Sequence, residues 1–89
     1  MRKGREELVV NSNNRTIGNH SVEYVNDKFR VFKYFGNKVC YVDDANKKFA
    51  LDDCGYSKYS STTATLNDYK YWFGSYKGYE LVRKEDMYA

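Results

Sequence analysis

Two pairs of neighbouring carboxylates are the side chains in this sequence best suited to chemistry. Asp43-Asp44 and Asp52-Asp53 could offer oxygen ligands to a divalent cation if the fold brought the pairs face to face. Neither pair matches the residue pattern of a calcium-binding loop. Aspartate is also favoured in turns, where its carboxylate accepts hydrogen bonds from the backbone that follows. We therefore interpret both pairs as turn residues and expect no metal, so a metal-dependent hydrolase is the weakest of three hypotheses.

Nucleophilic catalysis and zinc binding each need a set of residues that this sequence does not supply. The one histidine, His20, has no serine or cysteine partner at a known motif spacing. Cys40 and Cys54 lack the paired spacing of zinc ligands and have only His20 to join them. We expect two free thiols in a reducing compartment, and a disulfide between them stays open as an alternative. The sequence thus predicts no enzyme and no cofactor.

Residues 52–63 form the most distinctive segment of the chain. Tyr56, Lys58 and Tyr59 precede four hydroxyl residues at positions 60–63 and an expected helix. Free N–H groups and the positive dipole end of a helix favour an anion such as phosphate. A simpler interpretation is that the hydroxyls cap the helix and the tyrosines pack on the sheet. We predict that Tyr56, Lys58 and Tyr59 belong to a partner-binding surface, and anion binding stays open.

Part of this segment resembles a motif of small uncharacterised bacteriophage proteins. The motif has the form GYS…TTxxxLN, and the residues that resemble it are Gly55-Tyr56-Ser57, Ser61-Thr62-Thr63 and Leu66-Asn67, with two residues instead of three between Thr63 and Leu66. An Asn-Asn-x-Thr run, here residues 13–16, agrees with the same proteins. Lys58 and Tyr59 lengthen the turn before the threonines relative to that pattern. The resemblance implies a phage origin, a β-rich half before the helix and an accessory role, and it assigns no reaction.

A second set of aromatic residues lies near the C-terminus. Tyr71 and Trp72 fall off the apolar stripe of the expected helix, and Tyr76 and Tyr79 follow closely in sequence. Tyrosine and tryptophan are enriched at protein interfaces because they bury a large area at a small entropic cost. We predict that these four residues form an exposed partner-binding cluster. An equally weighted alternative is that Trp72 closes the edge of a small core.

The runner-up hypothesis is a nucleic-acid-binding module on the sheet. Arg30, Phe32 and Tyr34 share one face of an expected strand, with Tyr41 on a neighbouring strand and Lys33 on the opposite face. Aromatic rings among cations can stack on the bases of single strands. The opposite face is equally apolar, so the sequence leaves open which face is buried. A net charge of +3 permits nucleic acid without demanding it.

The elements that must position these residues form an α+β fold. Runs of β-forming residues between turn formers predict a four-stranded antiparallel meander, with strands at residues 21–25, 29–35, 38–42 and 47–51. Two-residue links at Asn26-Asp27 and Gly36-Asn37 predict tight hairpins, because such turns need positive φ at their centre. A short strand at residues 7–10 and a polar loop up to His20 precede this meander.

One C-terminal helix and a short final strand complete the predicted fold. Leu66, Tyr69 and Phe73 fall at helical spacing within residues 62–73 and predict the stripe that packs on the sheet. Gly74 stands where a left-handed cap would end the helix. Residues 79–83 predict the final strand. Residues 1–5 and 85–89 are expected to be flexible.

Together these features predict a single domain, residues 1–89, that acts by binding. With 89 residues and ten tyrosines its core is modest, so we also expect that a homodimer would add stability. No apolar run is long enough to predict a membrane span. The leading hypothesis is a phage-type accessory protein that binds and inhibits a host protein, such as a component of a defence system, in the host cytoplasm.

Overall fold

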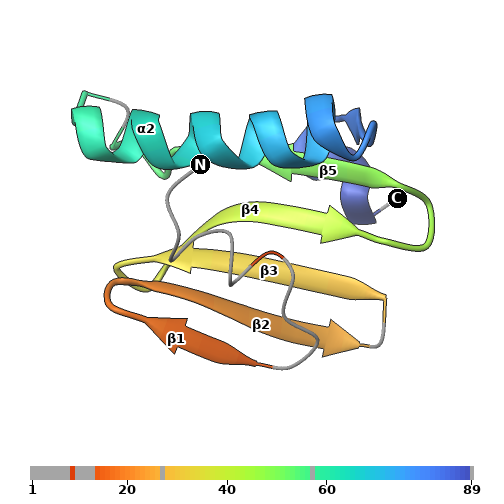
Figure 1. Cartoon of the computed structure of the whole chain (residues 1–89), viewed down its shortest axis with the longest axis horizontal. Helices are drawn as coiled ribbons and strands as arrows, with labels where there is room; N and C mark the ends of the chain where they lie inside the picture. Colours follow the sequence, from red (N-terminus) through yellow and green to blue (C-terminus); the bar gives the residue numbers. More distant parts are fainter. Residues whose placement is uncertain (1–8, 10–13, 27, 57, 89) are drawn as a thin grey trace.

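Six strands form one mixed sheet, and a long helix lies along one of its faces (Figure 1). The structure, a computed structural model, describes residue 9 and residues 14–26, 28–56 and 58–88. The strands are β1 Arg15–Ile17, β2 His20–Asn26, β3 Phe29–Tyr34, β4 Asn37–Asp43, β5 Lys48–Leu51 and β6 Glu80–Leu81. The helical elements are α2 Ser60–Tyr69, its π-helical continuation η1 Lys70–Tyr76 and the short 3₁₀ helix η2 Lys84–Tyr88.

Strands β2 to β5 are the antiparallel meander that the sequence predicts, and each strand end lies within one residue of its predicted position. The meander is only part of the sheet. At one edge β1 pairs antiparallel with β2, and at the other edge β6 pairs parallel with β5. A parallel neighbour needs a crossover connection, which α2 and η1 provide. The α+β class is therefore confirmed, whereas the four-stranded meander is matched only roughly.

The segment before β2 differs from the prediction. The polar loop expected up to His20 contains β1, which a turn at Gly18 and Asn19 joins to β2. Gly18 has a φ of 61°, which glycine adopts without a steric penalty. β1 has only three residues and shows no apolar alternation, so the sequence pattern missed it. The strand predicted at residues 7–10 lies outside the described residues except for Val9, which is helical and buried.

The hairpin between β3 and β4 turns one residue earlier than the sequence predicts. Phe35 and Gly36 both have positive φ, 52° and 79°, and Tyr34 pairs with Asn37 across the turn. Positive φ at both central residues is the geometry of the tight hairpin turn. Phenylalanine rarely adopts it, so the pairing of the two strands must hold Phe35 in this conformation. The other predicted two-residue link is Asn26-Asp27, and Asp27 lies outside the described residues.

The helix is longer than predicted and begins and ends at different residues. It spans Ser60 to Tyr76 when α2 and η1 are taken together, rather than residues 62–73. Gly74 is therefore inside the helix and does not end it. A Cβ atom at Gly74 would lie 3.3 Å from Cζ of Phe49, so glycine permits a close approach of η1 to β5. The left-handed residue beyond the helix is Gly78, with a φ of 75°.

Apolar side chains are buried on both faces of the sheet. The face beneath the helix holds the larger cluster, made of Val9, Val22, Phe32, Val39, Cys40, Val42, Phe49, Tyr69 and Phe73. The predicted stripe is confirmed, since Tyr69 and Phe73 are fully buried and Leu66 packs against this cluster. On the other face Val82 and Met87 cover a smaller cluster. Of residues 85–89, which the sequence predicts to be flexible, residues 85–88 belong to the short helix η2. No helix among the described residues is long and apolar enough to cross a membrane.

Candidate functional site

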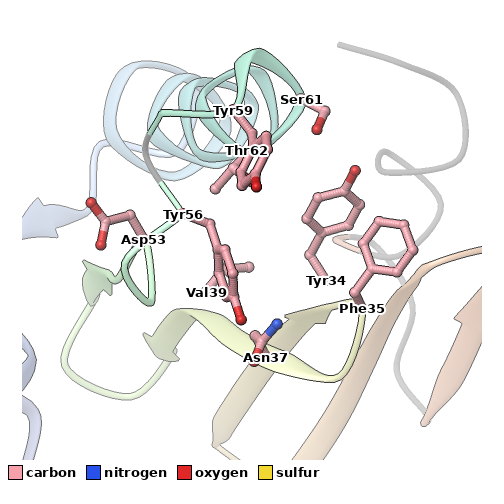
Figure 2. A pocket seen from close by; sticks show the side chains of 9 residues that line it. All are labelled: Tyr34, Phe35, Asn37, Val39, Asp53, Tyr56, Tyr59, Ser61 and Thr62. Carbon is pink, nitrogen blue, oxygen red and sulfur yellow. The ribbon is translucent and has the colours of Figure 1, made fainter.

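An open cavity of about 450 Å³ lies between the β3–β4 turn and the segment that leads into α2 (Figure 2). Its walls are largely aromatic. The lining residues are Tyr34, Phe35, Asn37, Val39, Asp53, Tyr56, Tyr59, Ser61 and Thr62. We call this cavity the aromatic pocket. Its volume lies within the range of about 300–1,000 Å³ that is usual for ligand sites.

A chain of turns before the helix positions one wall of the aromatic pocket. The Asp52 carboxylate accepts a hydrogen bond from the Cys54 N–H, and the Asp53 carboxylate accepts one from the Gly55 N–H, both at 2.9 Å. Cys54 and Gly55 both have positive φ, 54° and 82°. The Tyr56 N–H then donates to the Asp53 carbonyl. These backbone bonds, rather than burial of the ring, set the direction in which Tyr56 leaves the chain.

Asp52 connects this turn to the C-terminal part of the chain. The Cys54 N–H, followed by the Lys84 ammonium at 3.0 Å from the second carboxylate oxygen, holds the pKa of Asp52 below its usual range. The same contact raises the pKa of Lys84. Burial raises the pKa of the Cys54 thiol, whose sulfur lies 3.1 Å from the Lys38 carbonyl oxygen. The turn is thus held from two directions.

The opposite wall comes from the β3–β4 hairpin. Figure 2 shows Tyr34 and Phe35 on one side of the hollow and Tyr56 on the other. The Tyr34 ring is stacked on His20 at 4.7 Å between centroids and meets the Phe35 ring edge-on at 4.7 Å. Sequence reasoning assigned Tyr34 to a nucleic-acid-binding face and did not single out Phe35. The signal that could have found Phe35 is its place beside Gly36 in a tight turn.

The charges of the aromatic pocket are few. Asp53 supplies a carboxylate, and no lysine or arginine is among the lining residues in the described part of the chain. Lys58 was predicted to belong to this surface. It does not line the pocket, and its Nζ atom lies 5.4 Å from the ring centroid of Tyr59. Tyr56 and Tyr59, the other two residues of that prediction, both line the cavity.

The helix that borders the pocket begins without a side-chain cap. The sequence predicts that a hydroxyl from residues 60–63 caps it, but the cap position is held by Tyr59, whose side chain makes no capping hydrogen bond. Ser60 and Ser61 already belong to the helix and are exposed, and Thr62 is buried. The helix begins two residues earlier than predicted, so these hydroxyls lie inside it, past the position where they could cap it.

The second predicted aromatic cluster is divided. Tyr71 and Tyr76 are exposed and Trp72 is half-buried, and together they form what we call the helix-end surface. The rings of Trp72 and Tyr76 are stacked at 4.7 Å, and Lys77 Nζ lies 5.9 Å and 5.8 Å from their centroids. Trp72 also packs against the core beneath the helix, as the alternative interpretation predicted.

Tyr79, the fourth residue of the predicted cluster, is half-buried and packs against the core. Its ring packs on Phe73 at 5.8 Å, and its hydroxyl donates to a carboxylate oxygen of Asp44 at 3.0 Å. Burial, followed by this hydrogen bond, raises the pKa of Tyr79. Tyr79 follows the left-handed Gly78, which turns the chain back towards the sheet. The prediction that Tyr79 is part of an exposed cluster is therefore wrong.

The residues of the predicted nucleic-acid surface do not form one face. Phe32 is fully buried beneath the helix, and Tyr41 is buried on the opposite face of the sheet. Lys33 lies on that opposite face, at 2.8 Å from Glu23, and holds the pKa of Glu23 below its usual range. A base cannot stack on rings that other side chains cover. The alternative therefore loses the sheet platform on which it depended.

Arg30, the cation of that predicted surface, has a structural role. Its guanidinium donates two hydrogen bonds to the Asp44 carboxylate, at 2.8 and 2.9 Å, and a third to the Val9 carbonyl at 2.6 Å. Its Cζ atom also lies 5.4 Å from the ring centroids of both Phe32 and Phe73. A buried arginine with these partners is fully engaged in holding three segments together.

The aspartate pairs lie where strands end and turns begin: Asp43 is the last residue of β4, and Asp52 and Asp53 follow β5. Asp43 accepts hydrogen bonds from the backbone of Ala45 and Asn46 and from the Asn46 amide, which together hold its pKa below the usual range. Asp44 is engaged by Arg30. Within the described ranges, no group of three or more histidine, cysteine or acidic side chains could hold a metal ion. Cys40 and Cys54 are free thiols.

Comparison of the chain with protein-family models, with curated proteins and with solved structures found no match to any of them.

Proposed function

We propose that this chain is a small binding protein that attaches to a protein partner through the aromatic pocket. The observation that carries the proposal is the exposure of the rings around the cavity. Phe35, Tyr56 and Tyr59 are 63%, 45% and 52% exposed, although each is a large side chain that would gain stability from burial. Rigid aromatic side chains around a concavity are typical of the anchors of protein interfaces.

The way these rings are held supports the same proposal. Turns with positive φ at Phe35, Gly36, Cys54 and Gly55 direct the rings towards the cavity from two separate parts of the chain. A surface fixed before binding loses less conformational entropy when a partner docks. The pocket therefore combines large exposed apolar area with a fixed backbone frame.

We further propose that the partner is a host protein and that binding modulates it, as an inhibitor of a defence-system component would. The support for a phage origin is the resemblance of the motif at residues 55–67, which includes Tyr56 of the pocket. A chain of 89 residues that offers a binding surface suits an accessory protein that acts by occupying a site on another molecule.

The experiment that tests this function is a quantitative capture from bacterial lysate with tagged wild-type chain. The variant Tyr56→Ala/Tyr59→Ala removes two rings of the pocket, and Tyr71→Ala serves as a control because Tyr71 is also an exposed tyrosine but lies in η1 and does not line the pocket. We expect a captured protein that is lost with the double variant and kept with Tyr71→Ala. With that partner purified, the double variant should bind at least about 30-fold more weakly, as for a hot-spot pair.

Two results would contradict the proposal. One is the recovery of the same proteins by the wild-type chain and by the double variant. The other is a captured protein whose binding depends on Tyr71 and is indifferent to Tyr56 and Tyr59, which would move the interface to the helix-end surface.

A further inference from the structure

We propose that the aromatic pocket recognises an alkylammonium group, such as the side chain of a lysine or a methylated lysine on the partner protein. This inference rests on the proposed function and names the chemistry that the pocket would read.

Aromatic rings supply the largest side chains of the lining. Four of the lining residues are aromatic, and they come in two pairs from two parts of the chain. The ring centroids of Tyr34 and Phe35 lie 4.7 Å apart. Those of Tyr56 and Tyr59 lie 6.3 Å apart, with an angle of 38° between the ring planes. The face of an aromatic ring carries negative potential and attracts a cation held within about 6 Å of its centroid. Several rings around one hollow are the arrangement that binds methylated ammonium groups.

The charge of the lining favours a cation over an anion. The chain carries a net charge of +3. Among the lining residues, however, the charged side chain is an acidic one, Asp53. Figure 2 shows Asp53 beyond Tyr56, with its carboxylate directed away from the facing rings. Asp53 would therefore attract a bound cation through its electric field rather than by direct contact. At 0.1 M salt this attraction is largely screened beyond about 10 Å. The Asn37 amide and the Ser61 hydroxyl also line the cavity and can accept an N–H.

One ring of the pocket already holds a cation of the chain itself. The ammonium of Lys58 lies 5.4 Å from the centroid of Tyr59. Lys58 is exposed, so no burial forces its side chain towards this ring. The same side chain repels a second cation, so it should weaken binding of an alkylammonium guest. This gives a variant, Lys58→Gln, that should strengthen binding and that a merely apolar pocket would not respond to.

The start of α2 is the feature that would favour an anion. Ser61 and Thr62 lie in the first turn of the helix, where free N–H groups carry positive potential. In other anion sites of this kind, basic side chains commonly bind the anion together with the helix N–H groups. Among the described residues, the lining of this pocket contains no basic side chain. Anion binding is therefore one of the outcomes that the experiment must be able to detect.

The test compares three probes by NMR titration of isotope-labelled wild-type chain at low salt. The probes are choline, its uncharged isostere 3,3-dimethyl-1-butanol, and inorganic phosphate. We expect choline to shift the resonances of Phe35, Tyr56 and Tyr59, with the isostere binding at least about fivefold more weakly, as the loss of a cation–π contact requires. Fluorescence of Trp72, the one tryptophan, should not change, because it lies at the other end of the helix.

Variants then assign the effect to the pocket. Tyr56→Leu should weaken choline binding about fivefold or more, Asp53→Asn about twofold, and Lys58→Gln should strengthen it. The matched control Tyr71→Leu should leave it unchanged. Asp53→Asn keeps the shape and the acceptor oxygen of the side chain, so it tests the charge even if Tyr56→Leu perturbs the fold.

Three results would overturn the inference. They are equal binding of choline and its isostere, shifts of the pocket resonances by phosphate that exceed those by choline, and the absence of any shift by choline at the highest concentration used. The proposed function can survive each of them. If capture of a protein still depended on Tyr56 and Tyr59, the pocket would bind a partner through an uncharged or an anionic group.

Discussion

The aromatic pocket and the helix-end surface use the same residue types at opposite ends of one helix, and they differ in what their rings already touch. Thr62 of the pocket and Trp72 of the helix-end surface are ten residues apart, which is about 15 Å along the helix axis. At the helix end, Trp72 and Tyr76 stack on each other and Lys77 lies against both. In the pocket, two pairs of rings from different parts of the chain border an open cavity.

Exposure alone does not identify a binding surface in this chain. Tyr71 and Tyr76 are as exposed as Tyr59, but neither of them lines the aromatic pocket. A partner gains most where it can bury a side chain among several groups at once. The pocket offers several groups around one cavity. At the helix-end surface, the rings of Trp72 and Tyr76 already cover part of each other by stacking.

The largest expected effect concerns the support of the two regions. Asp44→Ala leaves the Arg30 guanidinium buried without its carboxylate and removes the acceptor of the Tyr79 hydroxyl, so it should destabilise the fold by about 3 kcal/mol. Asp53→Asn, at the pocket, should change stability by less than about 0.5 kcal/mol, because it keeps an acceptor for the Gly55 N–H. Urea denaturation followed by circular dichroism measures both. Equal losses for the two variants would show that Arg30 and Asp44 do not anchor the helix end.

A smaller effect should appear at low pH and should begin at the pocket. Hydrogen bonds hold the pKa of Asp52 below its usual 3.8, so the stability that Asp52 contributes is present above about pH 4 and is lost as the pH falls through the folded-state pKa. We expect a loss of at most about 1 kcal/mol after solvent screening, and Asp52→Asn should flatten this part of the pH profile. The amide signal of Tyr56 should respond before the fluorescence of Trp72.

The control for this pH experiment is the second depressed carboxyl in a turn. Asp43 also has a lowered pKa, but its turn joins β4 to β5 and does not carry Tyr56. Asp43→Asn should therefore alter the acid profile without moving the first change away from Tyr56. A simultaneous response of Tyr56 and Trp72 in the wild-type chain would mean that acid unfolds the chain as one unit and that the pocket turn has no separate sensitivity.

The smallest expected effect distinguishes the two cations that lie on rings. Lys77→Gln should change stability by less than about 0.5 kcal/mol, since the contact is exposed, and should shift the emission of Trp72. Lys58→Gln should leave that emission unchanged, because Lys58 lies against Tyr59. Steady-state fluorescence reports both. An identical shift in the two variants would show that the surfaces are coupled through the helix.

The sequence was most informative where local pattern decides structure. Alternating apolar residues and turn formers predicted the meander strands to within one residue, and helical spacing predicted that Tyr69 and Phe73 face the core. Tyr56 and Tyr59 were also assigned to a surface that the cavity includes. Each of these properties depends on neighbours within a few positions along the chain, which is why a single sequence was sufficient.

Tertiary packing decided the rest. The sequence predicts that Gly74 ends the helix. In the structure, the absence of a Cβ atom at Gly74 lets η1 approach Phe49, a residue far away in sequence. The sequence left open whether the sheet face that carries Arg30 and Phe32 is buried or exposed, and the helix packs on that face. The second wall of the pocket, Tyr34 and Phe35, comes from a hairpin that precedes Tyr56 by some twenty positions, so no local pattern could join them. Local sequence sets which rings the chain has and which elements carry them. Which rings are covered and which border the cavity follows from the packing of the helix on the sheet, because burial depends on contacts between distant segments.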